Sequence, residues 1–174
     1  MPLSSRQLVE FLEEVEKNLE QRITLVAAGG TAMTLYRKKP STIDVDLTGP
    51  ARDIELFRKA VHLVQPGFKI DSWPNGQVFS QLLPSDYLRK NRRIKTLRNI
   101  ELRALAPVDI VVTKIGRLDG RDYDDIKACI KGFKLSKRAI TQRAKRVQYA
   151  GNQKLYEHNL GTVTTDFFGK AKSR

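Results

Sequence analysis

The sequence predicts an α/β protein whose sheet is followed by a helical C-terminal part. Short apolar or alternating segments, which are typical of strands, crowd the first hundred residues, whereas segments with helical periodicity fill the rest. Of the 174 residues, 40% are hydrophobic and 29% are charged, so the chain can bury a core and lacks the composition of a disordered protein. No apolar run approaches the ~18 residues of a membrane span.

The first elements alternate between helix and strand. Ser4 and Gln7 have the spacing of a capping box, and apolar residues follow them at helical spacing. Residues 22–28 form a short, mostly apolar run that is typical of a buried strand. A helix over residues 31–37 should follow, and Pro40 should end it.

The middle of the chain continues this alternation. Residues 42–49 alternate between polar and apolar side chains, as a strand does, and residues 51–64 have helical periodicity. Residues 67–73 predict another strand, which the turn signal PNG at residues 74–76 closes. Residues 92–106 should hold one or two further strands.

Helices dominate from Pro107 onward. Pro107 suits the first position of a helix, the segment RDYDDIKACIKGF predicts a second helix, and Ser136 suits the cap of a third. Helix is also expected for the remainder, to Phe168. We therefore divide the chain into a core, residues 1–106, and a helical part, residues 107–174, packed on that core.

Charge is the strongest compositional signal. A net charge of +13 suits a polyanionic partner because each neutralised phosphate releases counterions, but a Lys-rich solubilising surface would give the same charge. Basic residues concentrate in two segments, residues 87–98 and 131–146. The single cysteine, Cys129, excludes an intrachain disulfide framework, and the acidic N-terminus does not have the pattern of a secretory signal. We therefore expect a cytoplasmic location.

Two aspartates form half of the candidate chemical motif, in the segment GGTAMTLYRKKPSTIDVDL. Asp44 and Asp46 stand two residues apart in a predicted strand, so we expect them to project from the same face. Two carboxylates this close repel each other unless a cation lies between them, and their hard oxygen atoms suit Mg²⁺ or Mn²⁺.

Two glycines form the other half of the motif. Gly29 and Gly30 fall where a strand gives way to a helix, so the bare backbone can approach a phosphate, and Thr31 adds a hydroxyl donor. A phosphate cradle facing a metal-binding acid pair is the minimum equipment for phosphoryl or nucleotidyl transfer. Taken singly, a glycine pair is usually a turn and an Asp-x-Asp pair a solvated strand edge, but their order along the chain favours a site.

The same segment resembles the signature of the DNA polymerase β-type nucleotidyltransferase superfamily, in which GG or GS precedes an Asp-x-Asp pair. It looks closest to the AbiEii-like branch, the nucleotidyltransferase toxins of type IV toxin–antitoxin systems. That branch has a Ser or Thr shortly before the acid pair, here Thr42, and a later Lys followed by RDxxD, here Lys114 and the segment RDYDD. The resemblance covers residues 25–47 and 107–130 well and is weaker between them.

The resemblance implies a nucleotidyltransferase-type mixed sheet with two metal ions held by three carboxylates. The first two carboxylates are Asp44 and Asp46. For the third we favour Asp71, because it lies on the next predicted strand between apolar residues, and Glu101 is the alternative.

The resemblance also implies a nucleotide site, with the roles distributed over Gly29, Gly30, Thr31, Lys114, Arg121, Asp122 and Asp125. Lys114 would place a positive charge on the triphosphate. Alternative interpretations remain open, since a lysine can pack its stem on apolar residues, and acids at a helix start offset the helix dipole.

These features predict an enzyme that transfers a nucleotide from a nucleoside triphosphate to an acceptor hydroxyl and releases pyrophosphate. The basic segments and the toxin branch favour RNA, above all tRNA, as the acceptor, and the branch implies a cognate antitoxin as a further partner. Two alternatives stay open at this point. One alternative to this prediction is a nucleotidyltransferase that modifies a protein or a small molecule. The other is a catalytically silent, basic nucleic-acid-binding protein on the same fold.

Overall fold

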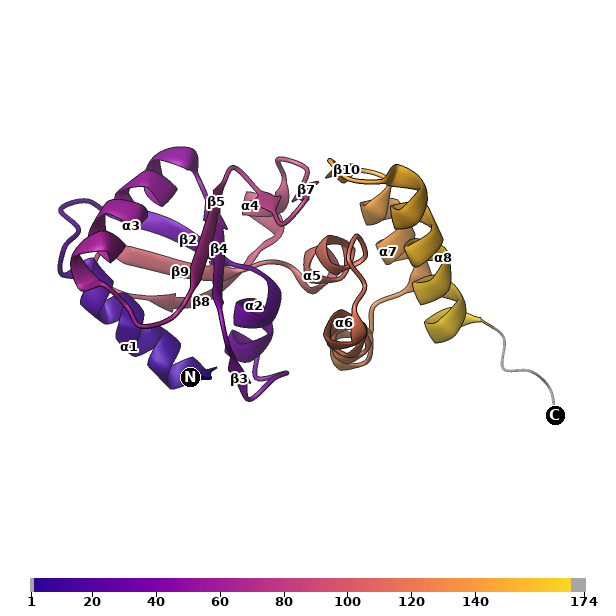
Figure 1. Ribbon diagram of the computed structural model, residues 1–174, viewed down its shortest axis with the longest axis horizontal. Helices are drawn as coiled ribbons and strands as arrows, with labels where there is room; N and C mark the ends of the chain where they lie inside the picture. The colour runs from indigo at the N-terminus through magenta and orange to yellow at the C-terminus, as the bar shows by residue number, and fades with distance from the viewer. Residues whose placement is uncertain (1, 170–174) are drawn as a thin grey trace.

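A computed structural model describes residues 2–169 of the chain (Figure 1). Its central sheet has five strands in the order β5-β4-β2-β9-β8. These strands are β2 (Ile23–Ala27), β4 (Val45–Gly49), β5 (Ile70–Pro74), β8 (Arg92–Thr96) and β9 (Ile100–Ala104). The pairs β2–β9 and β4–β5 are parallel, whereas β2–β4 and β8–β9 are antiparallel. The predicted mixed sheet flanked by helices is therefore confirmed.

Three helices of the N-terminal part pack on this sheet. They are α1 (Ser5–Glu16), α2 (Gly29–Leu35) and α3 (Ala51–Val64). The predicted capping box is confirmed, because the Gln7 N–H donates to the Ser4 hydroxyl at 3.3 Å and the Ser4 N–H donates to Gln7 Oε1 at 2.9 Å. Helices α1 and α3 pack against each other, and α2 lies between the sheet and the helix α5 (Pro107–Lys114) (Figure 1).

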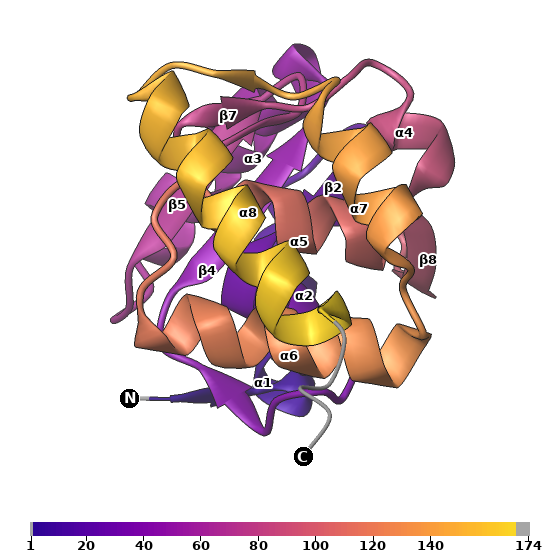
Figure 2. The same ribbon diagram turned by 90° about the vertical axis from the view of Figure 1, so that its right-hand side faces the viewer.

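Four helices of the C-terminal part gather at the other end of the molecule (Figure 2). They are α5 (Pro107–Lys114), α6 (Gly120–Phe133), α7 (Lys137–Ala144) and α8 (Gln153–Phe168). A buried ion pair fixes α7 to α5, since the Arg143 guanidinium donates to both carboxylate oxygens of Asp109 at 2.5 and 3.0 Å. Arg143 also reaches Asp86, at 2.6 Å, just before the short helix α4 (Tyr87–Lys90). No helix of the described residues is long and apolar enough to cross a bilayer.

A small sheet joins the two ends of the molecule. The strands β6 (Gln77–Val78) and β7 (Gln81–Leu82) form a hairpin, and β10 (Gln148–Tyr149) pairs with β7. None of these strands was predicted, because each has only two residues and no alternation can be read from two residues. The join matters because it places side chains of β7 and β10 beside the end of α5.

The predicted continuous strand over residues 42–49 is wrong. It is broken at Ile43 and Asp44, which form a bend between β3 (Ser41–Thr42) and β4. The reason is that β3 pairs with β1 (Leu3–Ser4) at the N-terminus, while β4 joins the central sheet. Ile43 is therefore 58% exposed, whereas the apolar residues Val45 and Leu47 of β4 are buried.

Candidate active site

The acids predicted to bind metal lie beside one another at one edge of the central sheet. In the parallel pair β4–β5, Asp46 stands directly opposite Asp71. Both side chains, together with that of Asp44, line a cavity of about 450 Å³. Glu101 is elsewhere, on β9, where it forms ion pairs with Arg103 and with Arg93. The geometry thus favours Asp71 over Glu101 as the third acid, because the register of β4 and β5 places Asp71 opposite Asp46.

Asp46 is the most perturbed acid of this group. Its side chain is almost wholly buried, and burial together with the nearby Asp71 carboxylate raises its pKa to about 7. Lys69 forms an ion pair with Asp71 at 2.6 Å, from the solvent side of the cavity. A buried carboxylate held next to a second one is costly in the absence of a cation, and such perturbed groups cluster at functional sites.

The donor atoms of this site fit a divalent metal ion. Carboxylate oxygens are the ligands that Mg²⁺ prefers, and Mg²⁺ typically takes one or two carboxylates and completes its shell with water and substrate phosphates. Within residues 2–169, no three acidic, imidazole or thiol groups stand close enough to enclose an ion by themselves. Phosphate oxygens of a nucleotide would therefore have to supply part of the shell.

Gly29 is required by the close packing around Asp46. Its backbone has φ +49°, a conformation that favours glycine, and a Cβ built there would lie 2.5 Å from Asp46 Oδ2 and 3.1 Å from the Phe79 ring. A Cβ on Gly30 would meet the Thr42 hydroxyl at 2.8 Å, and Gly30 lines the acid cavity. Gly29 therefore brings bare backbone against Asp46, and Gly30 brings it against Thr42, which also lines the acid cavity.

Replacing Gly29 by alanine is expected to impair the site by moving Asp46. The new methyl group would displace the carboxylate, and the positive φ would add strain of roughly 1 kcal/mol. We expect Gly29→Ala to lower kcat for nucleotide transfer at least tenfold, with a small loss of thermal stability. Gly161→Ala on α8, where an added Cβ meets nothing within 4 Å, is the matched control. Equal activity of the two variants would contradict the packing argument.

Thr31 has a different position from the one predicted. The residue is buried, its hydroxyl donates to Asp44 O at 3.2 Å, and the Asp46 N–H donates to the same hydroxyl at 2.9 Å. Thr42 Oγ1 also donates to Asp44 O, at 2.9 Å. These bonds tie α2 to the bend that carries the acids, so Thr31 positions the acid pair and its hydroxyl is not directed at a phosphate.

Lys114 stands at the other wall of the acid cavity, at the end of α5, where it is buried and ion-paired. Its Nζ lies 2.8 Å from Asp122 Oδ1 and 2.9 Å from Asp125 Oδ2. Although burial works against the charged form, these two carboxylates raise the pKa of Lys114. Burial alone would likewise raise the pKa of Asp122, but hydrogen bonds from Arg117 and Lys114 lower it. Lys114 and Asp122 are therefore both ionised at neutral pH.

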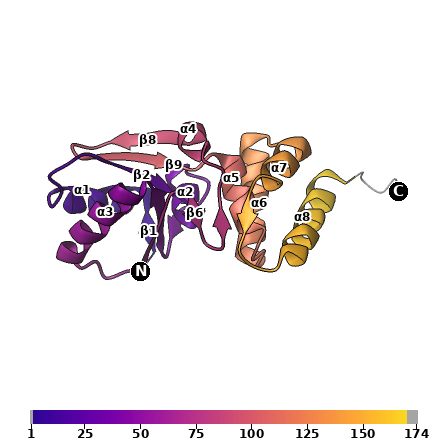
Figure 3. The same ribbon diagram turned by 90° about the horizontal axis from the view of Figure 1, so that it is seen from above.

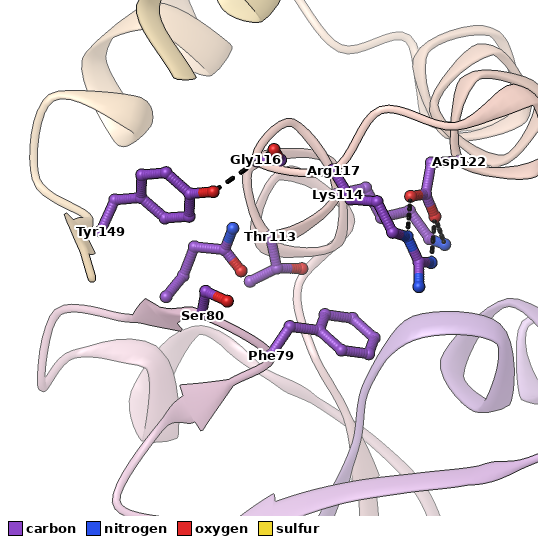
Figure 4. Close-up of a pocket in the computed structure, with 9 residues that line it drawn as sticks. Phe79, Ser80, Thr113, Lys114, Gly116, Arg117, Asp122 and Tyr149 are labelled. Atoms are coloured by element: carbon purple, nitrogen blue, oxygen red, sulfur yellow. Dashed lines mark hydrogen bonds and ion pairs between the residues drawn. The ribbon is translucent and has the colours of Figure 1, made fainter. Parts of the chain in front are cut away.

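Arg117 is a residue of this site that sequence reasoning missed. Its guanidinium donates to both oxygens of Asp122, at 2.6 and 2.8 Å, and its carbon atom Cζ lies 5.5 Å from the centre of the Phe79 ring (Figure 4). Arg117 follows Lys114 by three residues, a helical spacing that was available in the sequence as a signal. Lys39 and the predicted Arg121 also line the acid cavity. This wall is thus positively charged and faces the acids of β4 and β5.

Comparison with known proteins gives one family and one fold. Residues 6–159 match the family described as "Nucleotidyltransferase of unknown function (DUF6036)". The crystal structure of ANT(2'')-Ia in complex with adenylyl-2''-tobramycin superimposes with a TM-score of 0.53 and 13% identity, covering 79% of this chain and 95% of that chain. The solution structure of the antibiotic-resistance factor ANT(2'')-Ia superimposes with a TM-score of 0.54 and 10% identity, covering 81% of this chain and 91% of that chain. Likeness at such low identity shows a shared fold. No curated protein matches.

Proposed function

Since this chain belongs to the nucleotidyltransferase family DUF6036, we propose that it transfers a nucleotide from a nucleoside triphosphate to an RNA hydroxyl, with tRNA as the favoured acceptor. The observation that carries the proposal is the single cavity in which Asp44, Asp46, Asp71 and Gly30 face Lys114. The superfamily resemblance of the sequence motif to the AbiEii-like toxins adds a toxin role and a cognate antitoxin to the proposal.

The residues of the chain divide the work of the reaction. Gly29 and Gly30 bring the backbone close to the triphosphate, and Arg121 and Lys39 offset its charge from the opposite wall. The acceptor oxygen forms a bond to the α-phosphorus, the bond between that phosphorus and the bridging oxygen breaks, and pyrophosphate leaves. Asp71, which lies at the open edge strand, is placed to take the acceptor proton.

Asp44 and Asp46, with Asp71 beside them, are the residues that would hold a divalent metal ion, as nucleotidyltransferases generally require. When bound, such an ion supplies charge stabilisation at the phosphate oxygens and lowers the pKa of the acceptor hydroxyl. The raised pKa of Asp46 is consistent with a carboxylate that is built to face a cation.

The fold supports a long polyanionic acceptor because it joins the two predicted basic segments into one face. Between Asp86 and Glu101 the chain has six Lys and Arg residues and no acidic residue. Between Asp125 and Glu157 it has nine Lys and Arg residues and no acidic residue. The Arg92 guanidinium lies 5.2 Å from the centre of the Phe133 ring, so β8 and the end of α6 are in contact. We call this surface the basic face; its exposed cations include Arg89, Lys90, Arg92, Lys131, Lys134, Lys137, Arg138 and Lys145.

The basic face lies on the side of the molecule opposite the acids. In the sheet order, β8 is one edge strand and β5, which carries Asp71, is the other, so they are separated by roughly 20 Å. Figure 2 shows α4, β8 and α7 on one side and β5 on the other, and in Figure 3 α4, β8 and α7 again lie along one side of the molecule. Only an extended acceptor reaches both places, which favours RNA over a small molecule.

Neutralising the basic face is expected to weaken RNA binding in a salt-dependent way. For the triple variant Lys137→Ala, Arg138→Ala and Lys145→Ala, we expect the negative slope of log affinity against log salt concentration to become shallower by about 2. The triple variant Lys17→Ala, Lys59→Ala and Lys154→Ala removes the same charge from other exposed positions and serves as control. Equal slopes for both triple variants would refute the basic face as the RNA contact.

The acceptor class is tested by incubating the protein with total RNA, Mg²⁺ or Mn²⁺ and each labelled nucleoside triphosphate. Label on RNA that disappears in Asp44→Ala/Asp46→Ala supports the proposal. Label on protein or on a small molecule supports the alternative acceptor. RNA binding without transfer under all conditions would favour the catalytically silent alternative and overturn the proposed activity.

A further inference from the structure

A second cavity, of about 400 Å³, adjoins the acid cavity (Figure 4). Four residues line both of them, namely Phe79, Lys114, Arg117 and Asp122. The second cavity lies between the end of α5, the turn of the β6–β7 hairpin and β10, and its volume falls within the range of small-molecule sites. The reaction proposed above assigns no role to this second cavity.

Two aromatic side chains form opposite walls of this cavity. Tyr149, on β10, packs on Tyr156 with ring centres 5.3 Å apart, and its hydroxyl donates to Gly116 O at 3.4 Å. Phe79 packs edge-on against Trp73, with ring centres 5.3 Å apart. Phe79 also has φ +52°, because it is the first residue of the two-residue turn that joins β6 to β7, and this turn places its ring at the cavity.

A buried amide lies between these walls. Gln81 is only 2% exposed and lines the cavity. With its amide nitrogen turned towards the neighbouring carbonyls, it donates to Val78 O at 2.9 Å and to Thr113 O at 3.0 Å. The side-chain oxygen Oε1 is then the atom left to accept a hydrogen bond from a ligand. The Thr113 hydroxyl already directs its hydrogen to carbonyl groups of its own helix, so it has no hydrogen left to donate to a ligand.

We propose that this cavity binds the nucleobase of the nucleoside triphosphate, with Gln81 Oε1 accepting a hydrogen bond from a base N–H. The proposal rests on the function proposed above. It follows from the order of the groups along the two cavities. The acids and glycines lie at the phosphates, Lys114 and Arg117 lie at the shared boundary, and the aromatic rings of Phe79 and Tyr149 with the Gln81 amide lie beyond them. Stacking on aromatic faces and one amide contact are the chemistry of base recognition.

Gly116 allows this cavity to exist and offers a way to alter it. A Cβ on Gly116 would collide with the Gln81 amide and lie 2.9 Å from the Tyr149 ring. Gly116→Ala therefore displaces the Gln81 amide and the Tyr149 ring without removing a charged or polar group. Gly161→Ala is the matched control, as above.

The test compares two ligands that differ by the nucleoside. Binding of each nucleoside triphosphate and of inorganic tripolyphosphate is measured with Mg²⁺ present, on the full chain and on Gly116→Ala, Tyr149→Ala and Gly161→Ala. We expect the first two variants to lose roughly 5- to 100-fold in affinity for at least one nucleoside triphosphate and to keep their affinity for tripolyphosphate. Gly161→Ala should bind both ligands as the unmodified chain does.

Three results would overturn the base site in distinguishable ways. Equal affinity of the unmodified chain for tripolyphosphate and for all nucleoside triphosphates would mean that the base contributes nothing, while the proposed transfer still stood. Unchanged nucleotide affinity with a raised KM for RNA would make the cavity part of the acceptor site. No binding of either ligand to the unmodified chain would remove the proposed function together with the base site.

Discussion

Asp46→Asn is expected to reduce nucleotide transfer at least 1000-fold while leaving the fold intact. The substitution keeps the size of the side chain and its place opposite Asp71, but it removes the charge that would hold the metal ion. The ion stabilises several kcal/mol of charge in the transition state, so its loss corresponds to about three orders of magnitude in rate. Transfer of label to RNA in the presence of Mg²⁺ measures the effect.

The same variant should be more stable than the unmodified protein at and above neutral pH. Burial and Asp71 raise the pKa of Asp46 from 3.8 to about 7, so between these values the folded protein holds a proton that the unfolded chain has released. The free energy of unfolding therefore falls as the pH rises through this window. Above the window it is lower than below it by up to about 4 kcal/mol. Asn has no charge to bury, so the variant should lack this fall.

Urea unfolding between pH 4 and 8 checks the prediction, first without divalent metal and then with Mg²⁺. Mg²⁺ should restore the stability of the unmodified protein above pH 7 and leave Asp46→Asn unchanged. Asp124→Asn removes an exposed acid of α6 and controls for the net charge. A loss of stability in Asp46→Asn at pH 8 would show that Asp46 has a structural role and not the metal-binding role.

The parts of the site that sequence reasoning predicted are those encoded by local backbone requirements. Gly29 has a positive φ where β2 gives way to α2, and this backbone requirement is local even though the close approach that it allows is to the distant residue Asp46. The helices after Pro107 were predicted because caps and periodicity are local signals. Asp71 was favoured over Glu101 from strand order, and the register opposite Asp46 now gives that choice a geometric basis.

The parts that were not predicted depend on contacts between distant segments. The bend at Asp44 arises because β3 pairs with the N-terminal β1, a partner that no property of residues 41–49 indicates. Thr31 looked like a phosphate donor, but its hydroxyl is used by the backbone of the acid segment thirteen or more residues away. Tyr149 reaches the cavity through a two-residue strand. Local propensity carries no information about such pairings.

Lys114→Ala is expected to lower the free energy of unfolding by about 3–5 kcal/mol, because it removes the cation between two buried carboxylates. The side chains of Lys114, Asp122 and Asp125 are 4%, 1% and 9% exposed, so water cannot replace the lost charge. Lys127→Ala, an exposed lysine on α6, should change stability by less than about 0.5 kcal/mol.

A double variant separates this structural role from the predicted role at the triphosphate. In Lys114→Ala/Asp125→Asn one of the two orphaned charges is gone, so we expect part of the lost stability to return, while Arg117 continues to neutralise Asp122. If Lys114 also binds the triphosphate, the KM for the nucleoside triphosphate should stay raised by the same factor in the single and the double variant. If the lysine only holds the two aspartates, KM should recover together with stability, and the assignment of Lys114 to the nucleotide would then be wrong.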